Sequence, residues 1–422
     1  MQRALLRFLS PFLLLFPIGA TRSAAMLETP AALETSAALT LPDALALALQ
    51  ANPALAAARH EAAAMDGAAL QARARPNPEL QTLVEDTRRA SRSTTLQLNQ
   101  TLEVGGQRTA RIAVARHARD GAAIDVDAQR GATRAAASAA FFEVLTAQER
   151  LRLADSAHAL ARQAGQIAAR RVAAGKASPV EETRARVAES GARLDVGLAG
   201  GALLGARQRL AALWGNPAPR FSHADGRLDQ LPELPSAAEL ARRLAGAPAV
   251  LRAGAELAQR QAMAELESRR RTPDLNLSVG LKRSEELGRN QAIIGLSLPL
   301  PLFDTNQGNL LQALRRADKA GDELAGARLR AATELGAARQ RLQDARLEAA
   351  ALQGEIVPGA QSAYDAAAKG FEFGKFAFLD VLDARRTLLQ AHAQYLRALS
   401  DAHNAAAEIE RILGVATPAP TE

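Results

Sequence analysis

The sequence of 422 residues contains no cysteine. That absence excludes disulfide bonds, cysteine-ligated zinc, iron–sulfur clusters, a thiol nucleophile and a lipidated N-terminal cysteine. Aromatic residues make up only 3% of the chain, with one tryptophan and two tyrosines, which is few for the core of a large globular enzyme. Alanine takes their place, and alanine favours long, closely packed helices over sheets.

Catalytic motifs and clustered metal ligands are missing too. The glycines of residues 370–375 are too close together for a phosphate-binding loop. The six histidines are scattered, and none forms a His-x-x-x-His pair. His392 and His403 could share a helix face, but ordinary packed or surface histidines are the simpler interpretation. The sequence predicts no enzyme activity, no cofactor and no metal site.

The charge balance argues against a nucleic-acid partner. The formal net charge is +7, from 52 basic and 45 acidic residues, but both signs are mixed along the chain. Mixed charge is typical of the solvated faces of long helices.

The first 25 residues have the pattern of a signal peptide. Arg3 and Arg7 precede the apolar run Phe8–Ala20, and small residues follow, with cleavage expected after Ala25 and Ala20 as the second candidate. The run is too short for a membrane-spanning helix, which needs about 20 apolar residues. The sequence therefore predicts an exported protein.

The rest of the chain is one motif written twice. Matching segments recur at an offset that grows along the chain, in Asn52-Pro53 and Ala247-Pro248, Pro78 and Pro273, Thr101-Leu102 and Pro299-Leu300, Gly175-Lys176 and Gly374-Lys375, and Trp214-Gly215 and Leu413-Gly414. The growth falls between Pro273 and Pro299, where a hairpin loop best tolerates extra residues.

This duplication predicts the domain organisation. Residues 39–215 form the first repeat and residues 236–414 the second. The proline-rich segment 216–235 between them is the expected linker. Residues 415–422 form a C-terminal tail.

Within each repeat the expected order is helix, two strands, long helix, tight turn and helix. Leucine, isoleucine and valine alternate with polar or small residues in Asp274–Lys282 and Ile294–Leu300, and more weakly in the first copy. Strands of about 10 residues match tilted membrane β-strands. A half-buried hairpin of a soluble domain shows the same alternation, and the strands carry no Tyr or Trp for an aromatic girdle.

The longest predicted helices cover residues 108–174 and 308–373, with a kink or break expected at Pro358. Continuous helix over the first range would measure roughly 100 Å, too long for a compact domain. Four strands per chain cannot close a barrel, and open edges are not tolerated in lipid. Several chains would therefore have to pool their strands.

Two tight turns join the long helices. Gly175 follows a helix end rich in arginine. Glycine suits the left-handed conformation in which many helices end, and basic residues interact favourably with the last carbonyls. Ser178 and Glu181 then give a capping box with proline between them. In the second turn, after Gly374, Ala377 replaces the serine, so that cap should be weaker. Four phenylalanines gather here, and either hairpin self-packing or an exposed tip for a partner explains Phe371, Phe373, Phe376 and Phe378.

The duplicated pattern resembles the TolC-like outer-membrane efflux proteins. The most specific segments are Leu41–Leu45, the two turns and Phe378–Ala384. Within that superfamily the chain is most similar to outer-membrane components of cobalt–zinc–cadmium (CzcC-like) efflux pumps. That similarity rests on Leu102–Arg108, Pro299–Gly308, Asp383–Leu388 and Gln394–Leu399.

The resemblance implies a mainly helical fold with a small transmembrane β part. It implies a homotrimer with a 12-stranded β-barrel in outer-membrane lipid, continued by a long periplasmic α-helical barrel. The hairpin tips would dock a periplasmic membrane-fusion adaptor through Gly175, Lys176, Ser178, Gly374, Lys375 and Phe376. The energy would come from an inner-membrane transporter of the resistance–nodulation–division (RND) class, and the cargo would be divalent heavy-metal cations.

The resemblance also assigns a periplasmic gate to Asp380 and Asp383, one helical turn apart. In a trimer they would place six carboxylates around one axis, an arrangement that favours cations. Glu181 is the first-copy counterpart of Asp380. An aspartate that interacts with a helix N-terminus is the alternative interpretation.

Two other functions remain open from the sequence. The same duct could carry drugs or a secreted protein. A protein of another class, a soluble periplasmic coiled-coil adaptor or scaffold, is also compatible with the long helices, although the apolar strand faces argue against it.

Overall fold

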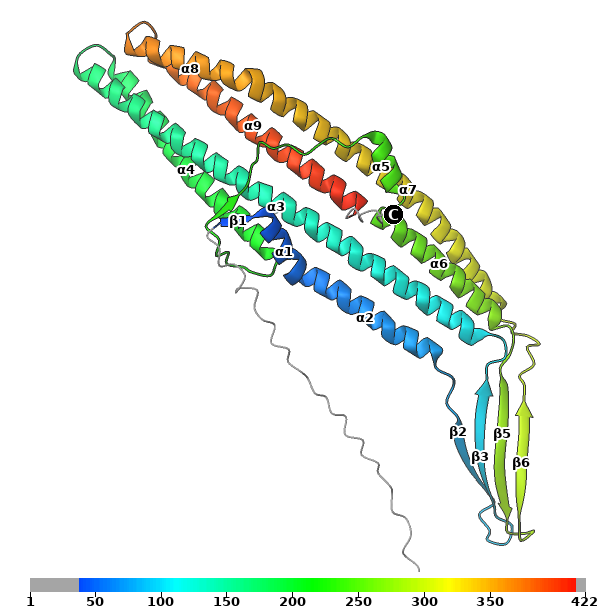
Figure 1. Ribbon diagram of the computed structural model, residues 1–422. Coiled ribbons are helices and arrows are strands. Elements are labelled where there is room, and N and C mark those ends of the chain that lie inside the picture. The colour runs from blue at the N-terminus through cyan, green and yellow to red at the C-terminus, as the bar shows by residue number, and fades with distance from the viewer. Residues whose placement is uncertain (1–37, 415–422) are drawn as a thin grey trace, which may run out of the picture.

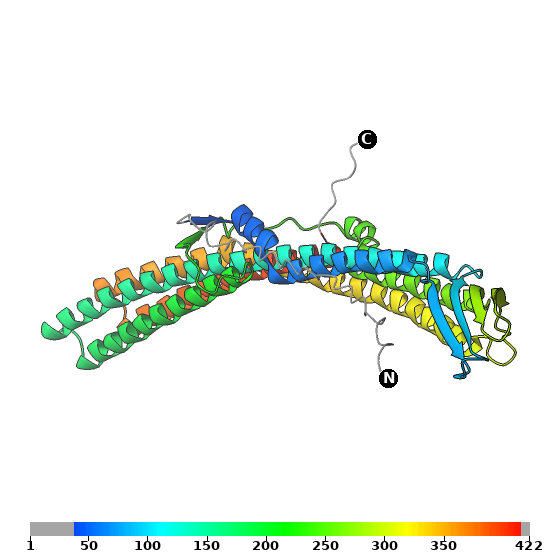
Figure 2. The ribbon, with the colours of Figure 1, turned by 90° about the horizontal axis from the view of Figure 1, so that it is seen from below.

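The computed structural model describes residues 38–414, and the predicted signal peptide and C-terminal tail lie outside this range. The chain is a long layer of helices with a four-stranded sheet at one end and two helical hairpin tips at the other (Figure 1). Seen from below, the layer is arched along its length (Figure 2). This elongated architecture confirms the predicted fold class, a duplicated and mainly helical chain with a small β part.

The first hairpin contains the longest helix. α3 (Gln107–Ala173) has 67 residues, about 100 Å at 1.5 Å per residue. Its N-cap, Gly106, is in the left-handed conformation, and half of its buried residues are alanine. α4 (Pro179–Ala212) returns along it. Small side chains allow the two helices to approach closely, as the composition predicts.

The second hairpin is interrupted where the sequence predicts it. α7 (Gln307–Ala351) passes into a π-helical turn, η2 (Leu352–Ile356), before α8 (Val357–Glu372) and the return helix α9 (Phe378–Leu413). Pro358 has no N–H to donate to the preceding turn, and its ring crowds that turn's carbonyl. A wider π turn relieves this crowding, so the break precedes Pro358.

Shorter helices complete the layer beside the sheet. α2 (Pro53–Arg73) packs on α3, and α6 (Pro248–Arg269) packs between α3 and α7. In each repeat, the glycine after the last helix lies against the proline that begins a helix near the start of the repeat. Gly215 lies against Pro53, and Gly414 lies against Pro248. Both glycines have positive φ, 76° and 71°. The duplication is therefore visible in the backbone.

The predicted linker is an ordered strap rather than a plain connection. It contains β4 (His223–Asp225), which pairs in parallel with β1 (Ala38–Thr40) next to α1 (Leu41–Ala51). α5 (Ala237–Leu244) follows it along the chain. In Figure 2 α1 and α5 lie on the convex side of the layer. Beneath the strap, Trp214, Phe141 and Phe221 are buried in the largest hydrophobic cluster.

The sheet has the order β2 (Glu79–Glu85), β3 (Ser93–Leu102), β5 (Leu275–Ser284) and β6 (Arg289–Ser297), all antiparallel. The central pair, β3 and β5, joins the two repeats. The strand predicted at Ile294–Leu300 stops pairing at Ser297, because Pro299 and Pro301 cannot donate to a ladder.

The prediction that the extra residues of the second repeat lie in its hairpin loop is wrong. That loop, residues 285–288, is shorter than its counterpart, residues 86–92. The extra length lies instead between β6 and α7, in residues 298–306, against residues 103–106 in the first repeat. The insertion therefore sits where the sheet meets the helices.

Candidate functional site

The strand register separates an apolar face of the sheet from a polar one. Leu98 pairs with Val279, and Val279 pairs with Ile294. Because side chains alternate between the two faces of a strand, every second residue of each of the four strands lies on the same face as these three. The exposed apolar members of this face are Leu80, Val84, Leu96, Leu98, Leu102, Leu277, Val279, Leu281, Ile294 and Leu296. One continuous face is therefore suited to a hydrocarbon environment.

The opposite face carries a network of polar side chains across the strands, with Leu83 and Ile293 as apolar exceptions. Ser278 donates to Asn99 at 2.8 Å, and Thr101 donates to Asn276 at 2.7 Å. The Lys282 ammonium lies 2.6 Å from the Glu85 carboxylate. Such a face is suited to line a water-filled lumen.

Both edges of this sheet are open. Within residues 38–414, β2 pairs only with β3, and β6 pairs only with β5. Open edges expose unpaired N–H and C=O groups, which is costly in lipid. No helix in the same range is long and apolar enough to cross a membrane.

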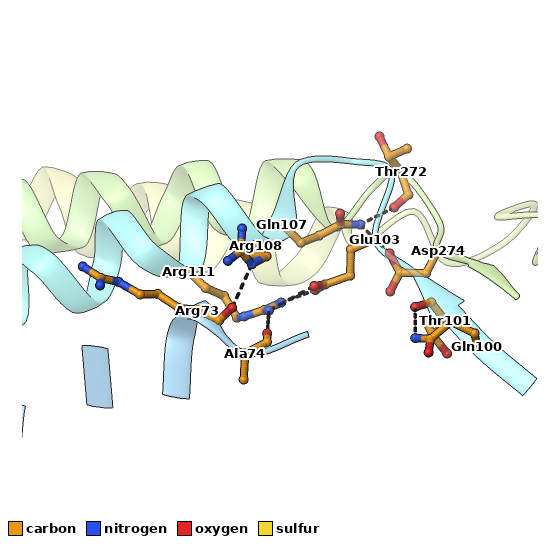
Figure 3. A network of polar contacts seen from close by, with 10 residues as sticks. All are labelled: Arg73, Ala74, Gln100, Thr101, Glu103, Gln107, Arg108, Arg111, Thr272 and Asp274. Atoms are coloured by element: carbon orange, nitrogen blue, oxygen red, sulfur yellow. Dashed lines mark hydrogen bonds and ion pairs between the residues drawn. The ribbon is translucent and has the colours of Figure 1, made fainter. Parts of the chain in front are cut away.

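A polar network fixes the corners where the strands meet the helices (Figure 3). The Arg111 guanidinium binds the Glu103 carboxylate and donates to the Ala74 carbonyl. Gln107 donates to the Thr272 carbonyl and to Asp274, at 2.8 and 3.0 Å. Residues of the segment Leu102–Arg108, singled out in the sequence, thus bind both neighbouring helix-to-strand connections.

The first hairpin tip is built as predicted at its glycine. Gly175 has φ +65°, and the Lys176 N–H donates to the Arg171 carbonyl at 2.8 Å. This is the glycine-terminated helix end expected from the sequence. The Ser178 hydroxyl caps α4 by accepting from the Val180 N–H at 3.3 Å.

The capping box predicted for this tip is only half present. No hydrogen bond joins the Glu181 carboxylate to Ser178. Glu181 is half-buried, and its Oε2 is shielded from solvent without a hydrogen-bond partner.

The second tip repeats the backbone but not the cap. Gly374 has φ +73°, and the Lys375 N–H donates to the Gly370 carbonyl at 2.7 Å. Ala377 has no side-chain acceptor, as the sequence predicts. The Asp380 carboxylate accepts instead from the Ala377 N–H at 2.9 Å. This supports the interpretation of Asp380 as a helix N-terminal residue.

The four tip phenylalanines divide into two pairs. Phe371 and Phe378 are buried, with ring centroids 5.4 Å apart. Phe373 and Phe376 are 73% and 50% exposed, and the neighbouring Leu379 is 58% exposed. Self-packing therefore describes Phe371 and Phe378, whereas Phe373 and Phe376 are left exposed at the tip.

The predicted gate residues do not share one environment. Asp380 and Asp383 are both exposed, and Asp383 lies 3.7 Å from Arg386. The buried positions of α9, Phe378 and Val381, face the hairpin interior, so the aspartates lie outside it. Glu181 is half-buried and therefore differs from its repeat counterpart.

Two arginines connect the hairpins near the tips. Arg171 of α3 donates to the Phe371 carbonyl at 2.6 Å and lies over the Phe371 ring. Arg385 of α9 donates to the Ala157 carbonyl at 2.6 Å and is only 8% exposed. Burial lowers the pKa of Arg385 and raises that of Tyr364 nearby. The sequence pattern does not indicate either connection, because each joins residues far apart in the chain.

Neither histidine considered in the sequence has the surroundings of a metal ligand. His403 is buried, and its ring stacks on that of Phe142 with the ring centroids 3.5 Å apart. Its Nε2 lies 3.0 Å from the Leu228 carbonyl oxygen. Burial lowers the pKa of His403, and burial together with nearby Arg152 lowers that of His392. Across the described range, no three histidine, aspartate or glutamate side chains are grouped to hold a metal ion.

Comparison with known proteins identifies the family of this chain. The sequence model of the family described as outer membrane efflux protein matches residues 44–216 and 240–415. The chain belongs to this family. It is 47% identical to the cobalt-zinc-cadmium resistance protein CzcC of Cupriavidus metallidurans over 87% of this chain and 88% of that protein. It is 29% identical to the nickel-cobalt-cadmium resistance protein NccC of Alcaligenes xylosoxydans, over 68% of this chain and 65% of that one.

Solved structures show the same fold. The crystal structure of CusC superposes with a TM-score of 0.77 and 18% sequence identity, covering 89% of this chain and 92% of that chain. The outer membrane protein VceC of Vibrio cholerae superposes with a TM-score of 0.75 and 18% identity, covering 89% and 96%. These findings confirm the family resemblance seen in the sequence.

Proposed function

We propose that the chain is the outer-membrane exit duct of a tripartite efflux pump and conducts divalent heavy-metal cations passively. The observation that carries the proposal is the four-stranded sheet with one apolar face, one polar face and two open edges. Three copies, each pairing β6 with β2 of the next, would close a barrel and leave no edge in lipid. The helical layers would continue its lumen through the periplasm.

The cargo is inferred from the relatives. CzcC, NccC and the nickel and cobalt resistance protein CnrC are all named for resistance to divalent metals. A duct needs no tight metal site, because strong binding slows release. Selection of the metal would then belong to the inner-membrane transporter, and no step at this chain is catalytic.

The hairpin tips are the proposed docking surface for a membrane-fusion adaptor. Gly175, Lys176 and Ser178 of the first tip are exposed, as are Gly374, Lys375 and Phe376 of the second. Exposed phenylalanine beside lysine offers an apolar contact within a polar rim, as protein interfaces do. The adaptor would link these tips to an RND transporter.

The proposed gate consists of Asp380 and Asp383 just behind the tips. Their exposure outside the hairpin interior is compatible with a position on the trimer axis. Glu181 is half-buried and would be a minor contributor at most.

The proposal is tested by deleting the gene and measuring growth in Co²⁺, Zn²⁺, Cd²⁺ and Ni²⁺, with dyes and antibiotics in parallel. Sensitivity to divalent metals that is restored by the wild-type gene is the expected result. Restoration should fail with a variant that lacks residues 275–297 but is still exported. Sensitivity to drugs alone would refute the metal cargo and leave the duct.

A further inference from the structure

The segment between β6 and α7, which holds the extra residues of the second repeat, exposes an unusual amount of apolar surface. Leu300 is 71% exposed, Leu302 74% and Phe303 93%. Phe303 is the most exposed large hydrophobic side chain among the described residues. Apolar groups left in water are costly, so this surface calls for a covering.

The spacing shows on which side this covering lies. Ile294 and Leu296 of β6 belong to the apolar face of the sheet. Leu298 and Leu300 continue the same alternation in the sequence past the last paired residue, Ser297. The chain then turns, because the Leu302 N–H donates to the Leu300 carbonyl at 2.9 Å. Pro299 and Pro301 alternate with these leucines and have no N–H for a further strand to bind. The segment therefore extends the apolar stripe beyond the end of the hydrogen-bonded sheet.

This segment is tied down at its far end. Asn306 donates to the Glu267 carbonyl at 2.9 Å and to its carboxylate at 2.8 Å. Asp304 accepts from the Asn306 N–H at 2.8 Å, and Thr305 donates to Gln307 at 2.8 Å. The exposure of Phe303 is thus built into an anchored connection.

Positive charge lies directly beside the apolar side chains. Arg270 and Arg271, from the end of α6, line a hollow of about 480 Å³ together with Leu300, Leu302 and Phe303. Asp304 also lines it, so the two arginines exceed the acidic residues of the lining by one charge. Arg270 binds Glu267 at 2.7 Å, whereas Arg271 has no ion pair within the described range. An arginine beside exposed leucine and phenylalanine matches the boundary between phosphate headgroups and acyl chains.

We propose that residues 298–303, with Arg270 and Arg271, form an interfacial anchor for phospholipids of the periplasmic leaflet of the outer membrane. Leu300, Leu302 and Phe303 enter the acyl boundary, and the arginines bind the headgroup phosphate. The inference rests on the proposed function, because it requires the sheet to lie in a membrane. Phe303 then supplies, from a connection, the interfacial aromatic ring that the strands lack.

The anchor is tested with tryptophan reporters in the full-length chain, reconstituted into phosphatidylethanolamine–phosphatidylglycerol vesicles that contain lipid brominated near the carbonyl end of the acyl chains. Three variants are compared, Phe303→Trp, Ile294→Trp on the apolar sheet face, and Phe373→Trp at the hairpin tip. The native Trp214 is fully buried and gives a constant background. Bromine should quench the reporters at 303 and 294 and leave the reporter at 373 unquenched.

The reporters distinguish failure of the lipid anchor from failure of the proposed membrane barrel. Quenching at 294 with none at 303 would overturn the anchor and keep the membrane barrel. Absence of quenching at both 294 and 303 would overturn the proposed function as well. If Phe303→Ser lowers the melting temperature of the trimer while Phe303→Trp is unquenched, the covering is the neighbouring protomer and the lipid anchor is refuted.

The arginines are tested by lipid selectivity. Spin-labelled phosphatidylglycerol should be preferred over phosphatidylcholine at the protein boundary. The pair Arg270→Gln and Arg271→Gln should reduce that preference by about fivefold per arginine, the factor expected for one basic residue near an anionic surface. Arg242→Gln with Arg243→Gln, on α5, removes the same charge far from the sheet and should change nothing. Equal selectivity in both double variants would refute the phosphate contact.

Discussion

Position 370 has no room for a larger side chain, because the ring of Phe376 lies against the Gly370 backbone. A Cβ atom at position 370 would lie 2.0 Å from Phe376 Cδ2 and 2.5 Å from Cε2. The ring is half exposed and can swing outward, whereas the Gly370 carbonyl would keep its bond to the Lys375 N–H. We therefore expect Gly370→Ala to displace the Phe376 side chain and leave the turn intact.

The gain in helix stability and the loss of Phe376 burial in Gly370→Ala should nearly cancel. Alanine in place of a helix-interior glycine stabilises by about 1 kcal/mol. Displacing a half-buried phenylalanine loses about half of its burial energy, again about 1 kcal/mol. Gly359 lies on the same helix with nothing within 4 Å of its added Cβ. Gly359→Ala should therefore show the full gain of about 1 kcal/mol.

Hydrogen exchange of the detergent-solubilised protein, followed by mass spectrometry over residues 357–376, measures local opening. Exchange should slow by about fivefold in Gly359→Ala and hardly change in Gly370→Ala. In a Phe376→Ala background the clash is absent, so Gly370→Ala should then slow exchange by about fivefold too. Equal slowing by Gly370→Ala in both backgrounds would refute the reasoning.

Four further tests concern the gate, the first tip, the sheet and the helical core. Asp380→Ala with Asp383→Ala should raise open-channel conductance in planar bilayers and reduce block by multivalent cations; unchanged values would remove the gate assignment. Gly175→Val should cost about 1–2 kcal/mol at the tip, because φ is +65° there, and weaken adaptor cross-linking while the trimer persists. Gly280→Ala would place Cβ 2.6 Å from the Leu96 carbonyl oxygen and should lower the melting temperature of the sheet, whereas Gly295→Ala, 3.4 Å from Ser278, should not. His403 is buried neutral with a lowered pKa, so its contribution to stability is present above about pH 6.5 and is lost as the pH falls below it. His403→Gln should reduce the drop in melting temperature between pH 7.5 and 5.5.

Features that depend on neighbouring residues in the chain were accessible from the sequence. The 67-residue helix, the break at Pro358 and the glycine-terminated turns each follow from local backbone chemistry. Alternation in the second repeat indicates both of its strands, but it places the second strand at residues 294–300, whereas the paired strand β6 covers Arg289–Ser297.

Features that depend on contacts between distant segments were not accessible. The three-residue strand β4 has no periodic pattern, and it exists because β1 pairs with it. The Arg385 contact with the Ala157 carbonyl likewise joins two repeats. The sequence conceals the position of the insertion, because the leucine spacing of a strand continues in Leu298, Leu300 and Leu302 after pairing has stopped at Ser297.

The repeats also show why a shared position does not guarantee a shared role. Glu181 and Asp380 both occupy the third residue of a helix after a tight turn. In the first tip the Ser178 hydroxyl caps the helix, so the Glu181 carboxylate is free to turn toward the packed side. In the second tip Ala377 offers no acceptor, and the Asp380 carboxylate remains at the exposed helix end, bound to the Ala377 N–H at 2.9 Å. The capping residue thus decides whether the carboxylate stays at the exposed helix end, and a Ser178→Ala variant should draw Glu181 outward to the same position.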